Sequence, residues 1–178
     1  VASDVSAKDY VACTDTAWID LSKGLGCPVG GVLTGSSEFI EEAWFWKQRL
    51  GGAMRQSGMM AAAGIFALDN NISRLAEDHE NARILGERLA QIDGIEINPD
   101  EIETNIIFFK VKTLNINAMQ LSDALLEQGI RIGATGVHDV RVVTHLDVDQ
   151  KGVIEAVEAI AKIMVRNTNQ VMLNLSLE

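Results

Sequence analysis

The sequence predicts an α/β fold in two parts, built from short strands and amphipathic helices. Residues 71–92 carry apolar side chains at every third or fourth position, the spacing of a helix with one buried face. Residues 18–21 and 106–109 are short, mainly apolar runs rich in aromatic and β-branched side chains, as strands are. Because a smaller α/β pattern begins beyond residue 71, the two domains are expected to span residues 1–70 and 71–178.

Composition limits the classes of function. At 178 residues with 47% hydrophobic side chains, the chain can bury a substantial core. A net charge of −10 argues against a nucleic-acid or anionic-membrane surface, because both need clustered Lys and Arg, so a small-molecule partner is expected. Cys13 and Cys27 belong to no spaced Cys/His set, which indicates neither a metal site nor a disulfide framework and favours the reducing cytoplasm. The sequence has neither an apolar run of membrane-spanning length nor a basic-then-apolar leader.

Lys23 lies in a glycine-rich turn between two predicted strands, residues 18–21 and 29–34. Loops at strand ends are where open α/β sheets bind ligands. The flanking leucines, and the absence of an acidic neighbour closer than Asp20, predict a partly desolvated amine that can form a Schiff base with an aldehyde cofactor. One alternative is a surface lysine in a glycine turn. Another is a phosphate-binding loop, which is disfavoured because Ser-Lys-Gly reverses the Gly-Lys-Ser/Thr order of that motif.

Helices are expected in the remainder of the first part. One exposed helical turn is expected at residues 7–11. Gly35-Ser36-Ser37 supplies an N-cap and Glu38 suits the positive end of a helix dipole, which predicts a helix through about Arg49. Apolar side chains lie on more than one side of this helix, so it is either an ordinary core helix or one that also contacts another subunit. Residues 59–69, rich in alanine and glycine, predict a closely packed helix.

The long helix predicted at 71–92 has a polar and an apolar side. His79 lies on the apolar side and is interpreted as a packed, hydrogen-bonded core residue. Asp93-Gly94 ends the helix. The polar side is formed by Arg74, Glu77, Asp78, Glu80, Arg83 and Glu87.

The second part is expected to combine a small sheet with two further helices. Asn117 caps the first of these helices and Gly129 ends it, whereas Asp147 or Asp149 caps the last one. The tail, residues 166–178, is either a tag or an interface strand. Strands are expected at 95–98, 103–112, 130–134 and 140–144, the last two as an antiparallel pair, and a helix at 118–128. The last helix should direct Val153, Val157, Ile160 and Met164 inward.

Two arginines are placed to bind anions. Arg55 begins the helix 59–69 among glycines, where backbone amides and a guanidinium can bind an anion together; the alternative is a helix-end arginine in solvent. Strand alternation directs Arg141 away from the packed side of its strand. A guanidinium held by a rigid strand suits bidentate capture of a carboxylate, the alternative being a strand charge kept for solubility. His145 is expected to fix the turn that follows the strand.

Five blocks of the sequence occur in order, up to about Met164. They are Ser22-Lys23-Gly24-Leu25-Gly26-x-Pro28-Val29-Gly30, Gly51-Gly52-x-Met54-Arg55-Gln56-x-Gly58, Arg74-Leu75-Ala76-Glu77-Asp78-His79-x-Asn81-Ala82, Thr104-Asn105-Ile106 and Arg141-x-Val143-Thr144-His145-Leu146-Asp147. Together they resemble the threonine aldolases, which are lyases dependent on pyridoxal 5′-phosphate (PLP) with the aspartate-aminotransferase-like fold, fold type I. The resemblance implies the end of the large PLP-binding domain in 1–70 and a small C-terminal α/β domain in 71–178.

The resemblance also implies a reaction and a set of roles. The reaction is aldol cleavage of L-threonine, L-allo-threonine or other β-hydroxy-α-amino acids to glycine and an aldehyde, a step of amino acid metabolism. Lys23 would be the catalytic residue and hold PLP as a Schiff base, Arg55 would contact the PLP phosphate across a subunit interface, and Arg141 would bind the substrate α-carboxylate. A homodimer or homotetramer with shared active sites follows from the role of Arg55.

The chain also departs from the family pattern Arg-Lys-x-Leu-Gly-Gly-Gly, since Gln48 stands where a lysine is common and Ala53 replaces the third glycine. It holds no candidate for the ring-stacking histidine, the aspartate at the pyridine nitrogen or the phosphate-cradling turn, which precede the lysine in the family. With its start at Val1, the chain is expected to be the C-terminal portion of a longer enzyme, inactive alone. The alternatives are a related PLP-dependent β-eliminating lyase or racemase acting on another amino acid, and a non-catalytic assembly module of this fold.

Overall fold

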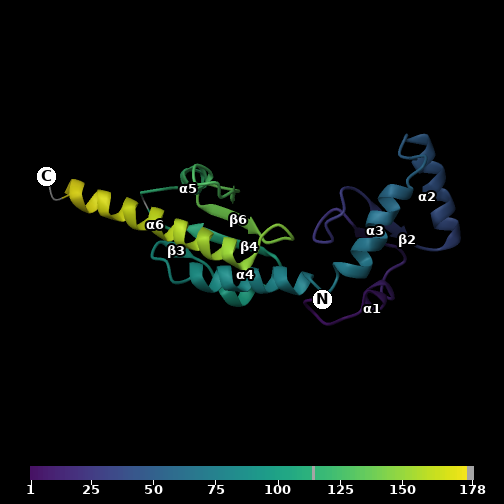
Figure 1. Cartoon of the computed structure of the whole chain (residues 1–178), viewed down its shortest axis with the longest axis horizontal. Helices are drawn as coiled ribbons and strands as arrows, with labels where there is room; N and C mark the ends of the chain where they lie inside the picture. Colours follow the sequence, from purple (N-terminus) through teal and green to yellow (C-terminus); the bar gives the residue numbers. More distant parts are fainter. Residues whose placement is uncertain (114, 176–178) are drawn as a thin grey trace. The chain divides into compact units, whose positions relative to one another are not determined.

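The computed structural model describes residues 1–113 and 115–175, with residues 167–175 as backbone only. Its contacts divide the chain into two compact units, Val1–Ala76 (unit 1) and Glu77–Glu178 (unit 2). The division lies between Ala76 and Glu77, whereas the sequence placed the boundary after residue 70. Both units mix helices with antiparallel strands (Figure 1), so the α/β class is confirmed. Among the described residues, no helix is both long and apolar enough to cross a membrane.

Unit 1 contains a two-stranded antiparallel sheet with Asp20 opposite Gly31. The second strand begins later than expected, because Gly30 has a φ of 119°, a left-handed conformation that interrupts the extended chain. The expected order of strands and helices is otherwise confirmed. The elements are α1 (Ala7–Val11), β1 (Ala17–Asp20), β2 (Gly31–Thr34), α2 (Ser37–Arg49) and α3 (Gly58–Asn70).

The α2 helix begins as the sequence predicts but buries none of its side chains. The Ser36 hydroxyl accepts a hydrogen bond from the Phe39 amide at 3.2 Å. Hydrogen bonds from the backbone amide of Glu38 and from Ser36 hold the pKa of the Glu38 carboxyl below its usual value. The interpretation of α2 as an ordinary core helix is therefore wrong for unit 1. Its exposed apolar side chains are Phe39, Ile40, Trp44, Phe45 and Trp46.

Unit 2 is built on a four-stranded antiparallel sheet with the order β3-β4-β6-β5. Side chains alternate across β4 and β6: Ile107 and Phe109 are buried opposite Val142 and Val140, while Phe108 is exposed. The long strand is thus covered on one face, as expected. The strands are β3 (Ile95–Glu96), β4 (Ile106–Val111), β5 (Gly133–Ala134) and β6 (Asp139–Val143), and a short 3₁₀ helix occupies Pro99–Glu101.

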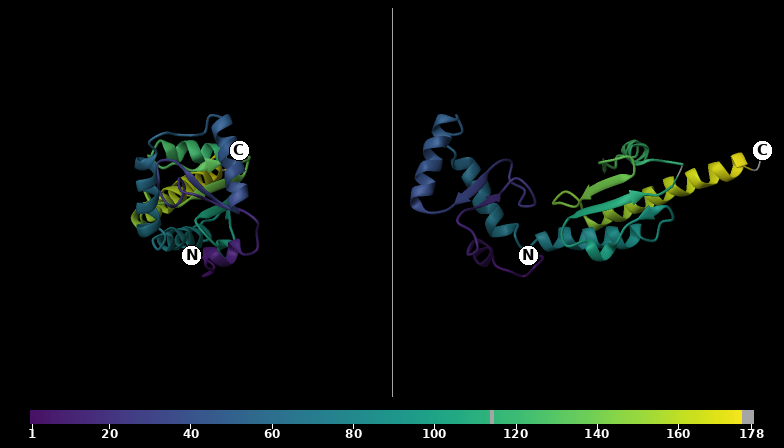
Figure 2. Two further views of the ribbon diagram at one scale, coloured as in Figure 1. Left: turned by 90° about the vertical axis from the view of Figure 1, so that its right-hand side faces the viewer. Right: turned by 180° about the vertical axis from the view of Figure 1, so that it is seen from behind.

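Three helices, α4 (Leu75–Leu89), α5 (Ala118–Leu126) and α6 (Gln150–Leu175), contribute the rest of the core of unit 2. Figure 1 shows α6 in front of the sheet, and the right-hand view of Figure 2 shows the sheet in front of α6. Asn117 caps α5 in a capping box with Gln120. At the start of α6, the Gly152 amide donates to Asp149 Oδ1 at 2.8 Å. The four residues expected to point inward from α6 are buried, namely Val153, Val157, Ile160 and Met164.

The α4 helix is shorter than expected and its buried side is rotated. Asp78, which the sequence placed on the polar side, is 1% exposed, and its backbone carbonyl accepts a hydrogen bond from Thr144 Oγ1 at 2.6 Å. His79, interpreted from the sequence as a packed, hydrogen-bonded core residue, is half-buried and so lies at the edge of the core. Ile72 precedes the helix and is exposed. The buried side of the helix therefore begins at Asp78 rather than at His79 and recurs every three or four residues. The buried residues are Asp78, Asn81, Ala82, Leu85, Gly86 and Leu89.

Of the two alternatives for the tail, a tag or an interface strand, the strand is wrong for the described residues 166–175. The backbone of residues 166–175 continues α6 as a helix. The last part of the tail, residues 176–178, lies outside the described residues.

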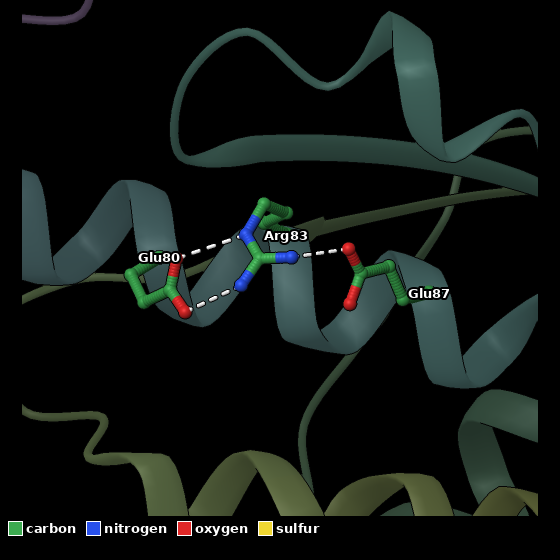
Figure 3. Close-up of polar contacts among 3 residues, drawn as sticks. All are labelled: Glu80, Arg83 and Glu87. Carbon is green, nitrogen blue, oxygen red and sulfur yellow. Dashed lines mark hydrogen bonds and ion pairs between the residues drawn. The ribbon is translucent and has the colours of Figure 1, made fainter.

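On the exposed side of α4, Arg83 bridges Glu80 and Glu87 (Figure 3). Its Nε and Nη2 atoms donate to the two carboxylate oxygens of Glu80 at 2.9 and 2.7 Å, and Nη1 donates to Glu87. The bidentate contact holds the pKa of Glu80 below its usual value and raises the pKa of Arg83. All three side chains are about half exposed, so solvent screening limits their contribution to stability.

Replacing Arg83 with Met should raise the pKa of Glu80, because the carboxylate loses two charge-assisted hydrogen bonds. A carboxylate with a depressed pKa in the folded state stabilises the fold above its unfolded pKa, and this contribution is lost as the pH falls through the folded pKa. Any deficit in the free energy of unfolding of Arg83→Met should therefore shrink on acidification below the ordinary Glu pKa of 4.5. An NMR pH titration of the side-chain carboxyl carbons measures the pKa directly. The control is Lys162→Met on α6, which should leave Glu80 unchanged; an unaltered Glu80 pKa in Arg83→Met contradicts the account.

Candidate active site

The loop that carries Lys23 is anchored in the small core of unit 1. Leu21, Leu25 and Cys27 are 7%, 8% and 7% exposed and cluster with Ala67 of α3. The Leu21 amide donates to the Gly30 carbonyl at 3.0 Å and the Cys27 amide donates to the Leu21 carbonyl at 2.9 Å. The loop therefore continues the strand pair with a defined backbone, and the side chains of Leu21, Leu25 and Cys27 pack with Ala67 of α3.

Close contacts tighten the loop on both sides of Lys23. The Gly26 amide donates to the Lys23 carbonyl at 2.8 Å, and Gly26 has a φ of 76°, which favours glycine. A Cβ atom on Gly24 would come within 2.8 Å of a methyl group of Leu75. The Asn71 side-chain amide donates to the Leu25 carbonyl at 2.7 Å, which fixes the loop to the end of α3.

The Lys23 side chain points away from this core. It is 78% exposed, and its Nζ atom lies 4.0 Å from Asp20 Oδ2. The expected partial desolvation is therefore wrong for this chain, because the flanking leucines are buried and leave Lys23 on the opposite side of the loop. Hydrogen bonds from the Ser22 hydroxyl and amide, at 2.7 and 2.8 Å, hold the pKa of Asp20 below its usual value, and the charge of Lys23 contributes less. The result is an accessible amine on a fixed loop, beside one carboxylate.

Arg55 lies in the turn between α2 and α3 and is exposed. The next residue, Gln56, has a φ of 55°, a left-handed conformation that is unusual for a residue other than glycine. Ser57 precedes α3 without a side-chain capping hydrogen bond. The Lys23 loop reaches α3 farther along, where the Cys27 thiol donates to the Ala63 carbonyl at 3.4 Å. Arg55 and Lys23 thus belong to the same unit but are not joined by a contact among the described residues.

Arg141 is exposed on β6 of unit 2, as strand alternation predicts. Phe108 of β4 lies opposite it on one side, and Gly133 of β5 lies opposite it on the other. The next pair on the same face of the two strands is joined by an ion pair, with Lys110 Nζ 4.0 Å from Asp139 Oδ1. No ion pair involves Arg141 within the described part of the chain, which leaves its guanidinium available to an added carboxylate.

The turn after β6 is held by side chains that the sequence only partly indicated. His145 Nδ1 accepts a hydrogen bond from the Asp147 amide at 3.2 Å, so His145 fixes this turn, as expected. The Asn105 side-chain amide donates to the Thr144 carbonyl at 2.9 Å. Asn105 and Asn71 act on positions 39 and 46 residues away, so helix or strand periodicity gives no signal for either contact.

A cavity of about 300 Å³ in unit 2 does not involve the expected site residues. It lies between α4, α6 and the segment that precedes β5, and Leu85, Ile130 and Val153 are among its lining residues. The structure thus places Lys23 and Arg55 in unit 1 and Arg141 in unit 2, each of them exposed.

Comparison with known proteins identifies relatives of the chain. A model of the beta-eliminating lyase family matches residues 1–112. The low specificity L-threonine aldolase of Escherichia coli K12 is 41% identical over 155 residues, which cover 87% of this chain and 44% of the relative. The probable low-specificity L-threonine aldolase 2 of Arabidopsis thaliana is 37% identical over 164 residues, covering 90% of this chain and 46% of the relative. The chain therefore spans less than half the length of these curated relatives.

Solved structures share the fold at lower identity. A putative L-allo-threonine aldolase from Listeria monocytogenes EGD-E matches with a TM-score of 0.73 and 20% identity, over 90% of this chain and 48% of that one. Serine palmitoyltransferase from Sphingomonas wittichii matches with a TM-score of 0.66 and 18% identity, over 88% and 41% of the two chains. These neighbours are fold type I enzymes, so the fold expected from the resemblance is confirmed.

Asn71→Ala should loosen the Lys23 loop and lower the free energy of unfolding by about 1 kcal/mol, the usual cost of one lost hydrogen bond. Urea denaturation measures the stability, and hydrogen exchange at the Gly26 amide should become faster. Asn70→Ala is the matched control, because the Asn70 side-chain amide donates to the Phe66 carbonyl of its own helix. Faster Gly26 exchange in Asn70→Ala to the same degree would show that Asn71 does not anchor the loop.

Proposed function

The chain belongs to the beta-eliminating lyase family, and on this basis we propose that it supplies the reactive lysine and two anion-binding arginines of a PLP-dependent threonine aldolase. The proposed reaction cleaves L-threonine or L-allo-threonine to glycine and acetaldehyde. The names of the relatives support this substrate class. The observation that carries the proposal is the presentation of the exposed Lys23 amine by a loop whose neighbouring side chains are buried.

The residues of the chain fit the chemistry of PLP and of an amino acid. Enzymes of this family are PLP-dependent. PLP carries an aldehyde, which a primary amine such as Lys23 can attack, and a phosphate, which a guanidinium such as Arg55 can bind. When bound, the cofactor supplies a carbonyl carbon for covalent attachment and a ring that accepts the electrons of the cleaved Cα–Cβ bond.

Lys23 is proposed to act through its Nζ atom. Its exposure leaves the amine free to approach an aldehyde carbon, and the anchored backbone limits the positions that Nζ can take. The Asp20 carboxylate lies beside this amine, with Oδ2 4.0 Å from Nζ. A lysine that alternates between a free and a protonated amine can hold a proton at Nζ and return it during the reaction.

Arg141 and Arg55 are proposed to orient the two anionic groups. The planar guanidinium of Arg141, standing on a rigid strand, can bind both oxygens of a substrate carboxylate. Arg55 precedes α3 without an ion-pair partner within the described residues, so it can bind the cofactor phosphate. Together these contacts would fix the substrate relative to the cofactor and restrict its rotation.

Unit 1 is proposed to be the end of the large cofactor-binding domain, and unit 2 the small domain. Because the chain spans less than half of its relatives, the other walls of the site are proposed to come from the part of those proteins that this chain does not match. We also propose a homodimer or homotetramer with shared active sites, supported by the exposed aromatic side chains of α2. The free thiols of Cys13 and Cys27 are consistent with the proposed cytoplasmic location.

The role of Lys23 is tested by covalent trapping in the full-length protein. After incubation with PLP and reduction with borohydride, mass spectrometry should find the cofactor attached to Lys23. Lys23→Ala should lack this adduct and lose activity by at least about 10²-fold, as expected for loss of a group that transfers protons. Lys8→Ala, an exposed lysine of α1, is the control and should behave as the wild type. An adduct retained in Lys23→Ala would refute the assignment.

Analysis of the products that the full-length protein forms from L-threonine identifies the reaction. Threonine aldolase activity yields glycine and acetaldehyde from L-threonine, whereas β-elimination would yield 2-oxobutanoate and ammonia. Detection of the second pair of products alone would replace the proposed activity with the alternative lyase.

Arg141→Lys should raise the KM for L-threonine by about 10-fold to 100-fold, with a smaller change in kcat, because lysine keeps the charge but not the bidentate contact. Steady-state kinetics measures both constants. Arg131→Lys changes another exposed arginine of unit 2 and should leave both constants near the wild-type values. An unchanged KM in Arg141→Lys would remove Arg141 from the proposed substrate site.

A further inference from the structure

One face of the unit 2 sheet is not covered by the helices of that unit. The core of the unit lies on the other face, which carries Ile107, Phe109, Val140 and Val142. The open face carries Phe108, whose side chain is 63% exposed. Exposing a large apolar side chain to water is unfavourable. A ligand or chain segment that covers the Phe108 ring would therefore gain free energy from removing this apolar surface from water.

Phe108 is the cross-strand neighbour of Arg141. In an antiparallel sheet, residues directly opposite each other point to the same face, with Cβ atoms about 4.5–5.5 Å apart. Phe108 therefore borders Arg141 on the β4 side. On the β5 side the opposing residue is Gly133, which has no side chain. The Arg141 side chain thus has an aromatic wall on one side and an open flank on the other.

Charge and space around this pair favour an anionic ligand with an apolar part. Lys110 is paired with Asp139, so the neighbouring cation of the face is already compensated while Arg141 is not. Phe108 also lines a groove of about 390 Å³, together with Glu96 and Asn98. The cation–ring contacts in the described part of the chain lie on α2, so Phe108 is not engaged in stacking with Arg141.

We propose that Phe108 is a specificity-determining residue of the substrate site, and this inference rests on the proposed function. The substrate carboxylate approaches Arg141 from the open side at Gly133 and binds its guanidinium. The ring of Phe108, on the other side of Arg141, then forms an apolar wall against the substrate side chain. Glycine has no side chain that could contact this wall. Threonine has a methyl group that can contact it. The wall would therefore separate amino acids by their carbon skeleton, while Arg141 binds the carboxylate that all of them share.

The test compares the binding of glycine with that of L-valine, which has nearly the shape of threonine but no hydroxyl group to react. Calorimetry on the full-length, cofactor-loaded protein gives both dissociation constants. Phe108→Ala should weaken L-valine binding by about tenfold, the discrimination expected for a small apolar contact, and glycine binding by less than about twofold. Phe108→Tyr keeps the ring and should retain the wild-type ratio. Leu126→Ala, an exposed apolar residue of α5, is the matched control and should change neither constant.

The outcomes separate this inference from its alternatives. Equal changes for glycine and L-valine in Phe108→Ala, or no change for either, would overturn it. A lower Tm with an unchanged ratio would show that the ring is covered by another part of the protein rather than by the ligand. If the wild type binds both amino acids but cleaves no threonine, the proposed function fails while the ratio still decides the role of Phe108. If the wild type binds neither amino acid, both proposals are overturned.

Discussion

The burial of Leu21, Leu25 and Cys27 against α3 is the constraint on which the candidate site depends. Lys23 has no packing of its own, because its side chain is largely exposed. Its position is set by neighbours that turn inward and by the Asn71 hydrogen bond to the loop. A flexible lysine on a mobile loop would have to lose much conformational freedom before reacting. Here the folding of unit 1 has already fixed the backbone, so only the four-carbon stem remains to be ordered.

In unit 2, one face of the sheet holds the core and the other carries the residue proposed to bind the substrate carboxylate. Its inward face joins α4, α5 and α6 in a continuous apolar core, and its outward face carries Arg141 beside Phe108 and Gly133. Because successive strand residues point to opposite faces, Arg141 stands between two residues that hold the core, Val140 and Val142. A shift of one residue in the pairing of β6 would exchange these roles, so the core that stabilises the unit also keeps the guanidinium outward.

Local signals in the sequence were sufficient to predict most helices and strands, and to predict that Arg141 points away from the core. The Ser36 and Asn117 caps and the alternation of β6 depend on residues close in the chain, and the structure agrees with them. Two of the failures depend on contacts between distant residues. Asp78 is buried where β6 ends beside α4, and the exposure of Lys23 follows from the packing of its loop on α3. The assigned family also could not be read from one lysine turn, because it needed five ordered blocks.

The α2 helix, with its aromatic side chains exposed, bears on how the protein is made in the cell. Unit 1 leaves the ribosome before unit 2 and has a core of only Leu21, Leu25, Cys27 and Ala67, a small fraction of the apolar surface it carries. While they are uncovered, Trp44, Phe45 and Trp46 are open to nonspecific association. Lys47 and Arg49, whose cationic groups lie 5.4 and 4.9 Å from the centres of the Trp44 and Phe45 rings, add charge along this surface, the arrangement by which charged residues beside an apolar segment disfavour aggregation.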